Sequence, residues 1–225
     1  MRLPGTSKTV PMHLAINTSN LTEWAEKEKK VMEEAVVDYI SKLELLFEFQ
    51  LNQKIPIMSI KLLHKADKLS NELALYFKKL STDARIHDNK VRVFIIGRWY
   101  DLDPELVEAV KGVMEATKDY DDNFLNFCIA YDGQDEIVSG VRVLARQVKA
   151  GKIEPDEITD DVVKENLFSS YFPPPDLIIE TSRTYSGLLL WDAKNALIHF
   201  SDKLFMDTKK EDYLKALDIY KKSAE

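Results

Sequence analysis

Residues 123–148, NFLNFCIAYDGQDEIVSGVRVLARQV, place two periodicities side by side. The run from Asn123 to Tyr131 is almost continuously apolar, which is typical of a strand buried on both faces of a sheet. Beyond it, Ile137, Val141 and Leu144 recur at intervals of four and three residues, which indicates one apolar face of a helix. A buried strand that leads into an amphipathic helix is the unit from which parallel α/β sheets are built.

The same alternation of short apolar runs and longer helical stretches continues on both sides of this segment. Branched residues such as Val91, Val93 and Ile95 are frequent in the short runs, as they are in strands. The sequence therefore predicts an α/β fold with a mostly parallel central sheet of about six strands flanked by helices. The expected strands are Met12–Asn17, Ile55–Leu63, Lys90–Gly97, Asn123–Tyr131, Leu177–Thr181 and Ala196–Phe200.

Helical periodicity is strongest between the first two expected strands, where residues such as Tyr39 and Leu43 predict one long helix over residues 22–53. Asp103 and Pro104 supply the N-cap and the first-turn proline of another helix. Gly151 is the glycine that ends the helix following the fourth strand. Further helices are expected around Leu69, Leu73, Tyr76 and Leu80, around Leu106, Val110 and Val113, and around Tyr213, Leu217 and Tyr220.

Composition restricts the size and the partners of the protein. A chain of 225 residues with 45% hydrophobic content can bury one substantial core, so we expect a single domain over residues 1–225 with a flexible N-terminus at residues 1–11. The net charge is −7 and the basic residues are spread along the chain. Nucleic acid is therefore excluded as an expected partner, because binding it requires a basic stripe.

Cysteine usage and hydropathy indicate the compartment. Cys128 is the only cysteine, so an internal disulfide is excluded and a reducing compartment is expected. No run of about 18 apolar residues occurs, and the first residues have no signal-peptide pattern. We expect a cytoplasmic protein whose only membrane contact is peripheral, through a partner or a lipid.

Common signatures of metal and nucleotide sites are missing from the sequence. The four histidines, His13, His64, His87 and His199, lie far apart and form no paired metal-ligand spacing. There is no Gly-x-x-x-x-Gly-Lys-Ser/Thr loop, no Gly-x-Gly-x-x-Gly turn and no Gly-x-Ser-x-Gly elbow. Composition and periodicity alone thus predict an α/β domain without a visible active site.

Two segments match motifs that carry more information. The segment from Ile129 to Val138, IAYDGQDEIV, resembles a strand-to-helix motif in which Tyr-Gly-Gly and an acidic residue precede Ile-Val. The stretch from Pro175 to Trp191 is similar to Pro-Asp-Leu-Ile-Ile-Arg-Thr-Ser-Gly with its continuation Ser-x-Phe-Leu-Leu-Trp-Gln. Both motifs are those of the cis-prenyltransferases, the undecaprenyl diphosphate synthase family, and the likeness covers most of the chain. The resemblance implies that family's fold.

Three positions depart from the family's pattern where the family binds diphosphates. Ser19 stands in place of the aspartate associated with magnesium and the allylic diphosphate, and Glu23 replaces an arginine of the same loop. Glu180 occupies the position of the signature arginine that helps to hold isopentenyl diphosphate. At about 4 Å and an effective dielectric near 20, a unit charge contributes about 4 kcal/mol, so the reversal strongly disfavours a phosphate. We therefore expect no catalytic residue and no metal ligand in this chain.

A few polar residues of the signature are candidates for residual substrate binding. Ser182 and Ser186 match serines of the motif, and Arg183 is a candidate to replace the second arginine of the family, although the loop here is shorter. The family's Ser-x-Glu-Asn-Trp loop after the second strand has no counterpart, because this chain reads SIKLLH at residues 59–64.

The first hypothesis drawn from the resemblance is a non-catalytic accessory subunit. It would pair with a catalytic cis-prenyltransferase subunit, as a heterodimer or higher heteromer that makes long-chain polyprenyl diphosphate for glycosyl carrier lipid. This chain would bind no cofactor, and the catalytic partner would need Mg²⁺. The candidate interface residues are Leu188, Leu190, Trp191, Ile198, Phe200 and Phe205.

Two alternatives remain open at the level of sequence. The chain could be an atypical cis-prenyltransferase that acts alone on allylic and isopentenyl diphosphates, with Asp132, Asp135, Glu136 or Arg183 handling a diphosphate or a cation. It could also be a polyprenyl-binding module. Turnover by the isolated chain separates the first alternative from the accessory subunit, and polyprenyl binding without turnover identifies the second.

Overall fold

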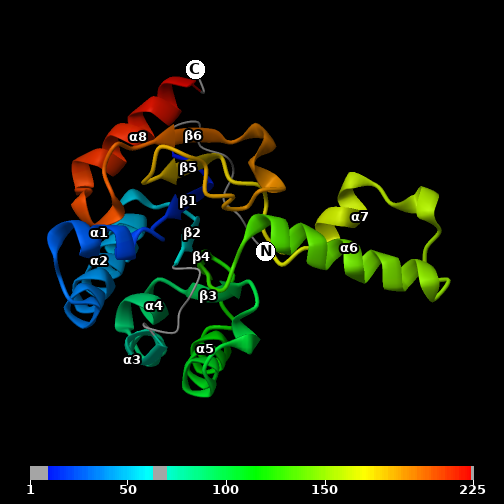
Figure 1. The fold of residues 1–225 in the computed structure, drawn as a ribbon, viewed down its shortest axis with the longest axis horizontal. Coiled ribbons are helices and arrows are strands. Elements are labelled where there is room, and N and C mark those ends of the chain that lie inside the picture. The colour runs from blue at the N-terminus through cyan, green and yellow to red at the C-terminus, as the bar shows by residue number, and fades with distance from the viewer. Residues whose placement is uncertain (1–9, 63–69, 224–225) are drawn as a thin grey trace.

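A computed structural model of the chain describes residues 10–62 and 70–223. Six parallel strands form one sheet in the order β3-β4-β2-β1-β5-β6, as Figure 1 shows. This confirms the predicted parallel α/β fold, and each expected strand is present with slightly narrower bounds. The strands are β1 His13–Asn17, β2 Ile57–Lys61, β3 Val91–Ile96, β4 Asn123–Cys128, β5 Leu177–Glu180 and β6 Leu197–Phe200.

Strand β1 lies at the centre of the sheet, between β2 and β5. Leu14 pairs with Met58 of β2 on one side and with Leu177 of β5 on the other. Strands β2, β4 and β3 thus lie on one side of β1, and β5 and β6 lie on the other. In open parallel sheets, ligands bind outside the carboxyl ends of the strands where the order reverses, which here is the crevice between β1 and β5.

Alternate residues of each strand contribute to two separate cores. Leu14 and Ile16 belong to the larger core, with side chains of the helices α2, α3, α5 and α8 on one face of the sheet. Ala15 belongs to a smaller core on the opposite face, with Phe172 and Leu188. The helices are α1 Leu21–Glu28, α2 Met32–Gln53, α3 Ser70–Leu80, α4 Ala84–Asp88, α5 Pro104–Ala116, α6 Gly133–Lys149, α7 Asp160–Glu165 and α8 Lys210–Ser223.

The predicted long helix over residues 22–53 is wrong in one respect, because it is two helices. Helix α1 ends at Lys29, which adopts the left-handed conformation with φ of 54°, and its N–H bonds back to the carbonyl of Glu26. Val31 is extended and precedes α2. Apolar periodicity continues across this break, so it could not reveal a turn made by the backbone of a lysine.

Other predicted helix boundaries are confirmed. The Asp103 carboxylate accepts from the N–H of Glu105, with Pro104 in the first turn of α5. Gly151, with φ of 65°, follows α6 and donates to the carbonyl of Val148. Residues 1–9 of the expected N-terminal segment, together with Leu63, His64 and Leu69, lie outside the described residues.

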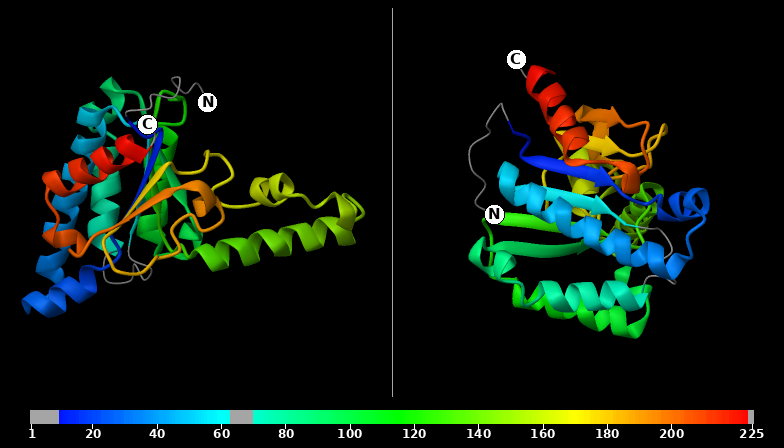
Figure 2. Two further views of the ribbon diagram at one scale, coloured as in Figure 1. Left: turned by 90° about the horizontal axis from the view of Figure 1, so that it is seen from above. Right: turned by 90° about the vertical axis from the view of Figure 1, so that its left-hand side faces the viewer.

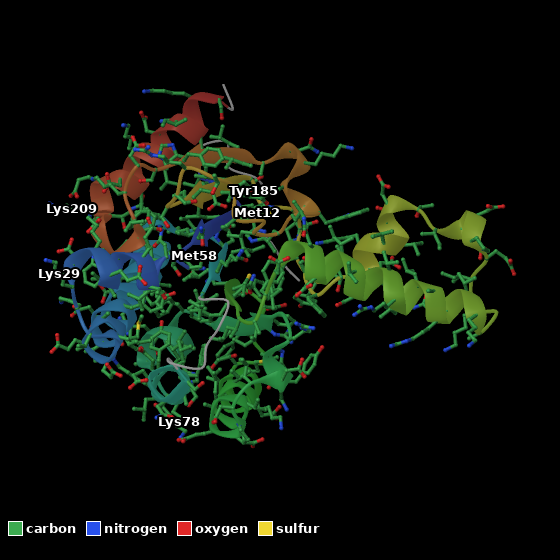
Figure 3. The ribbon with its side chains drawn as sticks, viewed as in Figure 1. Met12, Lys29, Met58, Lys78, Tyr185 and Lys209 are labelled. Carbon is green, nitrogen blue, oxygen red and sulfur yellow. The ribbon has the colours of Figure 1, made fainter. Side chains whose placement is uncertain are left out.

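The segment from residue 133 to residue 165, called the arm below, projects from the body of the molecule (Figures 1 and 2). It contains α6, the short 3-10 helix Pro155–Glu157 and α7. In Figure 3, Met58 lies in the middle of the body, where it is fully buried, whereas Lys78 lies at the edge. Among the helices of the described residues, none combines the length and the apolar composition needed to cross a bilayer.

Candidate functional site

Polar side chains gather at the carboxyl ends of three neighbouring strands. Asn17 ends β1, Lys61 ends β2 and Glu180 ends β5. All three residues are buried, and the loop that contains Ser186 lies over them through hydrogen bonds to Lys61 and Glu180. These four residues, called the edge cluster below, occupy the crevice in which a parallel sheet of this order would bind a ligand.

Both carboxylate oxygens of Glu180 are used within the protein. One oxygen accepts from the N–H of Ser186 at 2.9 Å and from its hydroxyl at 2.7 Å, and the other accepts from the Asn17 side-chain amide at 2.8 Å. Glu180 has no exposed surface. In place of the family's positive charge, this position has a buried carboxylate, which links the loop at Ser186 to Asn17 of β1.

Lys61 completes the edge cluster from the other side. Its ammonium donates to the carbonyl of Ser186 at 2.5 Å, and the residue is 6% exposed. Burial lowers the pKa of Lys61, while the carboxylates of Asp132 and Glu180 act in the opposite direction. Sequence reasoning missed both Lys61 and Asn17, although a charged or amide residue at the end of an apolar strand was a visible signal.

The polar groups of the loop after β1 also form hydrogen bonds within the chain. The Asn17 side-chain oxygen accepts from the N–H of Ser19 at 3.1 Å and from its hydroxyl at 2.7 Å. The amide of Asn20 donates to the carbonyl of Thr181 at 2.6 Å, and its oxygen accepts from the N–H of Phe205. Asn17 therefore brings two of the departing positions, Ser19 and Glu180, into one network.

The structure does not bring the other candidate residues into the edge cluster. Glu23 is exposed in the first turn of α1, where a carboxylate favours the helix dipole. The Ser182 hydroxyl donates to the carbonyl of Thr184 in its own loop. The Arg183 side chain is 86% exposed and lies 3.7 Å from Asp202, so it does not stand in the place of a phosphate-binding arginine. Of the residual substrate-binding candidates, Ser186 alone joins the edge cluster.

The predicted interface residues fall into two groups. Leu188 and Phe205 are fully buried in the chain's own core, so neither offers surface to a partner. Phe205 packs edge-on against Tyr39, with ring centroids 5.5 Å apart. Leu190, Trp191 and Ile198 are half-buried and Phe200 is exposed, and for these four residues the interface stays a prediction.

A second buried network lies where the arm joins the body. The Tyr131 hydroxyl donates to Glu136 at 2.6 Å and accepts from the N–H of Leu189 at 3.0 Å. The other oxygen of Glu136 accepts from the N–H of Ser169 at 2.8 Å, and burial raises the pKa of Glu136. Glu136 is 1% exposed, so it braces the core and does not face a ligand.

The remaining acidic candidates also have structural partners. Asp132 caps α6 by accepting from the N–H groups of Gln134 and Asp135. Asp135 lies 3.5 Å from Arg98. Over residues 10–62 and 70–223, no three His, Cys, Asp or Glu side chains gather closely enough to hold a metal ion.

His13 lies at the opposite, amino-terminal end of β1. Its Nδ1–H donates to the carbonyl of Pro173 at 2.8 Å, and its Nε2 accepts from the hydroxyl of Ser59 at 2.8 Å. Asn126 in turn donates to that hydroxyl. Complete burial lowers the pKa of His13 to about 4, so the imidazole is neutral. The histidine is a structural link between strands and not a metal ligand.

Fold and site together define a class of protein: a parallel α/β domain whose polar groups at the strand ends are bonded to one another. A family model described as "Putative undecaprenyl diphosphate synthase" matches residues 22–225. The chain belongs to the undecaprenyl diphosphate synthase family. The resemblance seen in the sequence is thereby confirmed at the level of the family.

Two curated relatives of this chain come from archaea. A tritrans,polycis-undecaprenyl-diphosphate synthase (geranylgeranyl-diphosphate specific) of Methanopyrus kandleri is 37% identical over 148 residues, which are 65% of this chain and 55% of that protein. A protein of the same name from Pyrococcus horikoshii is 30% identical over 227 residues, which are 96% of this chain and 86% of that protein. The match thus spans little more than half of the first relative and most of the second.

Solved structures confirm the fold. Lavandulyl diphosphate synthase from Lavandula x intermedia, in complex with dimethylallyl diphosphate, superposes with a TM-score of 0.85 at 22% identity, covering 96% of this chain and 97% of that one. A probable undecaprenyl diphosphate synthase from Campylobacter jejuni gives a TM-score of 0.65 at 21% identity, covering 93% and 94%. At such identities the likeness establishes the shared architecture.

Proposed function

We propose that this chain is a non-catalytic accessory subunit of a heteromeric cis-prenyltransferase that makes long-chain polyprenyl diphosphate for glycosyl carrier lipid. The observation that supports it most is the buried Glu180 carboxylate, which is fully hydrogen-bonded where the family's signature has an arginine. A second support is the loop at Ser19, whose N–H and hydroxyl both bond to Asn17.

These contacts would disfavour the binding of a diphosphate at the strand ends. A phosphate about 4 Å from the Glu180 carboxylate would be repelled by about 4 kcal/mol per unit charge at an effective dielectric of 20. The donors that could offset this repulsion are already bonded to Glu180, to Asn17 or to the Ser186 carbonyl. Displacing them would leave buried polar groups without partners, which costs about 1–3 kcal/mol each.

The proposal assigns the catalytic groups and the Mg²⁺ to the partner subunit. This chain would hold the partner in its active form through surfaces that the closed crevice does not use. The complex as a whole would then make the peripheral contact with a membrane or a polyprenyl lipid.

The direct test compares the chain alone with the chain in complex. Purified chain is incubated with an allylic diphosphate, isopentenyl diphosphate and Mg²⁺, and product is followed by radiolabel incorporation. We expect no turnover by the chain alone, and higher turnover when it is co-expressed with an intact family member from the same organism. Turnover by the chain alone, or a partner equally active without it, contradicts the proposal.

The named relatives favour a second candidate, an atypical cis-prenyltransferase that acts alone. Curated relatives of the chain that carry the names of synthases are 27–37% identical to it. If this candidate is correct, the isolated chain turns over substrate, and Lys61→Met lowers that turnover, whereas Lys118→Met, at an exposed position in the turn after α5, does not. Polyprenyl binding without turnover, with no partner captured, would instead identify a polyprenyl-binding module.

A further inference from the structure

A cavity of about 350 Å³, called the α2–α8 cavity below, lies between the second half of α2 and the start of α8. Its apolar walls come from Leu45, Leu46 and Phe49 of α2 and from Tyr213 of α8. The ring centroids of Phe49 and Tyr213 are 5.5 Å apart. The volume falls within the range of about 300–1,000 Å³ that is usual for sites of small molecules. No residue of the edge cluster lines this cavity.

Two exposed lysines line the same cavity where α8 begins. They are Lys209 and Lys210, and Figure 3 shows Lys209 at the edge of the body. Neither lysine forms an ion pair with another residue of the ranges 10–62 and 70–223. The first N–H groups of a helix have no acceptor within it, and the partial positive charge of that helix end adds to the two ammonium groups. This side of the cavity therefore suits a negatively charged group.

The carboxylates near these lysines do not occupy that place. Glu48, which also lines the cavity, lies 3.0 Å from Arg85. Asp212, in the first turn of α8, lies 2.6 Å from Lys203. Glu211, in the same turn, is exposed and does not line the cavity. The positive charge beside the apolar walls is thus left for a ligand.

Lys42 lines the cavity from α2 and is partly used within the chain. Its ammonium donates to the carbonyls of Met206 and Thr208, at 2.6 Å each, and lies 5.4 Å from the centroid of the Phe205 ring. An ammonium has three donors, so one remains for a ligand. Burial lowers the pKa of Lys42 to about 8, so this side chain is still mostly protonated at pH 7.

We propose that the α2–α8 cavity binds an amphiphile with a single alkyl chain and an anionic head, with the chain against the apolar walls and the head beside Lys209 and Lys210. Apolar walls alone would accept any hydrophobic molecule, whereas cations at one side of them favour an anion. Leu45 is 62% exposed and would be covered by the bound chain. The inference goes beyond the proposed function, because the site lies outside the strand-end crevice.

Isothermal titration calorimetry of the full chain tests the proposal. The probes are decanoate and decyl phosphate, each below the concentration at which it forms micelles, and we expect saturable binding. Acetate and inorganic phosphate lack the chain, and decyltrimethylammonium has a cationic head, so all three should bind at least about tenfold more weakly. The tighter of the two probes identifies the head as a carboxylate or as a phosphate.

Charge reversal tests the place of the head. Lys209→Glu with Lys210→Glu turns two attractive charges into two repulsive ones and should weaken binding of the probes at least about tenfold. Lys149→Glu with Lys152→Glu is the matched control, because these lysines are also exposed but lie on the arm. The control changes the net charge by the same amount and should leave the affinity unchanged.

A change in the apolar wall tests the place of the chain. Leu45→Asp puts a carboxylate where the alkyl chain would lie and should also weaken binding at least about tenfold. Leu75→Asp on α3 is its control, because Leu75 is 64% exposed and does not line this cavity. Circular dichroism confirms that each variant is folded.

Several outcomes overturn the inference. Equal binding of decyltrimethylammonium would mean apolar contact without a site for the head, and equal binding of acetate or inorganic phosphate would mean an adventitious ion only. Absence of binding by both probes also refutes it. Binding that survives either the lysine reversal or Leu45→Asp would place the amphiphile elsewhere. Failure of the proposed function would show instead as turnover by the isolated chain, which leaves these affinities unaffected.

Discussion

The edge cluster and the arm differ in the burial and the hydrogen bonding of their charged side chains. In the edge cluster, Lys61 and Glu180 are buried and every donor or acceptor named above has a partner in the same chain. On the arm, Arg142 and Asp160 are exposed and lack such partners. Buried charges persist only when they are hydrogen-bonded, whereas exposed charges of this kind gain little from their own chain. The contrast is between buried charges that are hydrogen-bonded within the chain and exposed charges that are not in any ion pair among the described residues.

The difference bears on where function resides in this chain. In a catalytic family member we would expect open, unsatisfied donors at the strand ends, because a diphosphate needs them. Here the donors and acceptors at the strand ends already have partners within the chain. This arrangement is one support for the accessory role proposed above.

Glu180→Ala should break the edge cluster most strongly. It leaves the buried Asn17 amide and both donors of the half-buried Ser186 without an acceptor, so we expect a loss of about 4 kcal/mol in the free energy of unfolding. Urea unfolding measures it. Glu180→Gln keeps an acceptor at the site and should cost less than half as much. Equal losses for both variants would contradict the role given to the carboxylate.

The contribution of the buried His13 to the free energy of unfolding should depend on pH. Its folded pKa of about 4 lies below the ordinary value of 6.5, so the unfolded state binds more protons between these two pH values. Its contribution is therefore complete above pH 6.5 and falls by about 3 kcal/mol as the pH drops to about 4.

Unfolding curves of His13→Asn against wild type over this pH range measure the contribution of His13. The variant should be less stable at pH 7 but lose less on acidification. His199→Asn, at a half-buried histidine on β6 whose pKa is also lowered by burial, should change the slope by a smaller amount. Parallel curves for His13→Asn and wild type would refute the assignment.

Gly133 lies at the point where the two regions meet. A Cβ there would be 2.3 Å from the carbonyl oxygen of Gly187 and 2.5 Å from Cβ of Leu190, so Gly133→Ala should destabilise the fold by about 3 kcal/mol. Gly112 on α5 has open space around it, and Gly112→Ala should stabilise the protein by up to about 1 kcal/mol. Thermal unfolding of both variants tests the pair, and similar effects would argue against the close contact.

Lys61→Met should loosen the edge cluster without removing its carboxylate. Loss of the bond to the Ser186 carbonyl and of a compensating charge should cost about 2 kcal/mol. Hydrogen exchange should accelerate in residues 182–187, which the ammonium fastens. Lys118→Met is the exposed control and should change neither quantity. Unchanged exchange in this loop would show that Lys61 is not what holds it.

Charge reversal on the arm should have the smallest effect on folding. Arg142→Glu with Arg146→Glu touches no intrachain partner, so the free energy of unfolding measured at high salt should change by less than about 0.5 kcal/mol. A larger loss would mean that Arg142 and Arg146 stabilise their own chain, and the contrast with the edge cluster would then disappear.

Much of the fold was predictable because its signals are local. Each strand of the sheet is an apolar run bounded by polar residues, and caps such as Asp103 and Gly151 are encoded within a few positions. The break at Lys29 was not predictable, since it depends on a left-handed backbone at a residue with no such preference. Burial of Leu188 and Phe205 likewise depends on distant segments that cover them.

The site was predictable in part. Comparison with the family's motifs identified Ser19 and Glu180 as altered positions, but not the residues that fill the resulting space. Asn17 and Lys61 come from two other strands, and only the sheet order brings them together with Glu180. Arg183 matched the motif by chain distance, yet its loop carries it into solvent.

The central position of β1 also governs when the sheet can be completed during synthesis. Its second neighbour, β5, begins at Leu177, and the bond between Asn17 and Glu180 joins residues 163 positions apart. A growing chain folds from its N-terminus, so one edge of β1 stays unpaired until that late strand has left the ribosome. An exposed strand edge is a template for pairing with other chains. Chains that end before Leu177 should therefore aggregate, even though they contain four of the six strands.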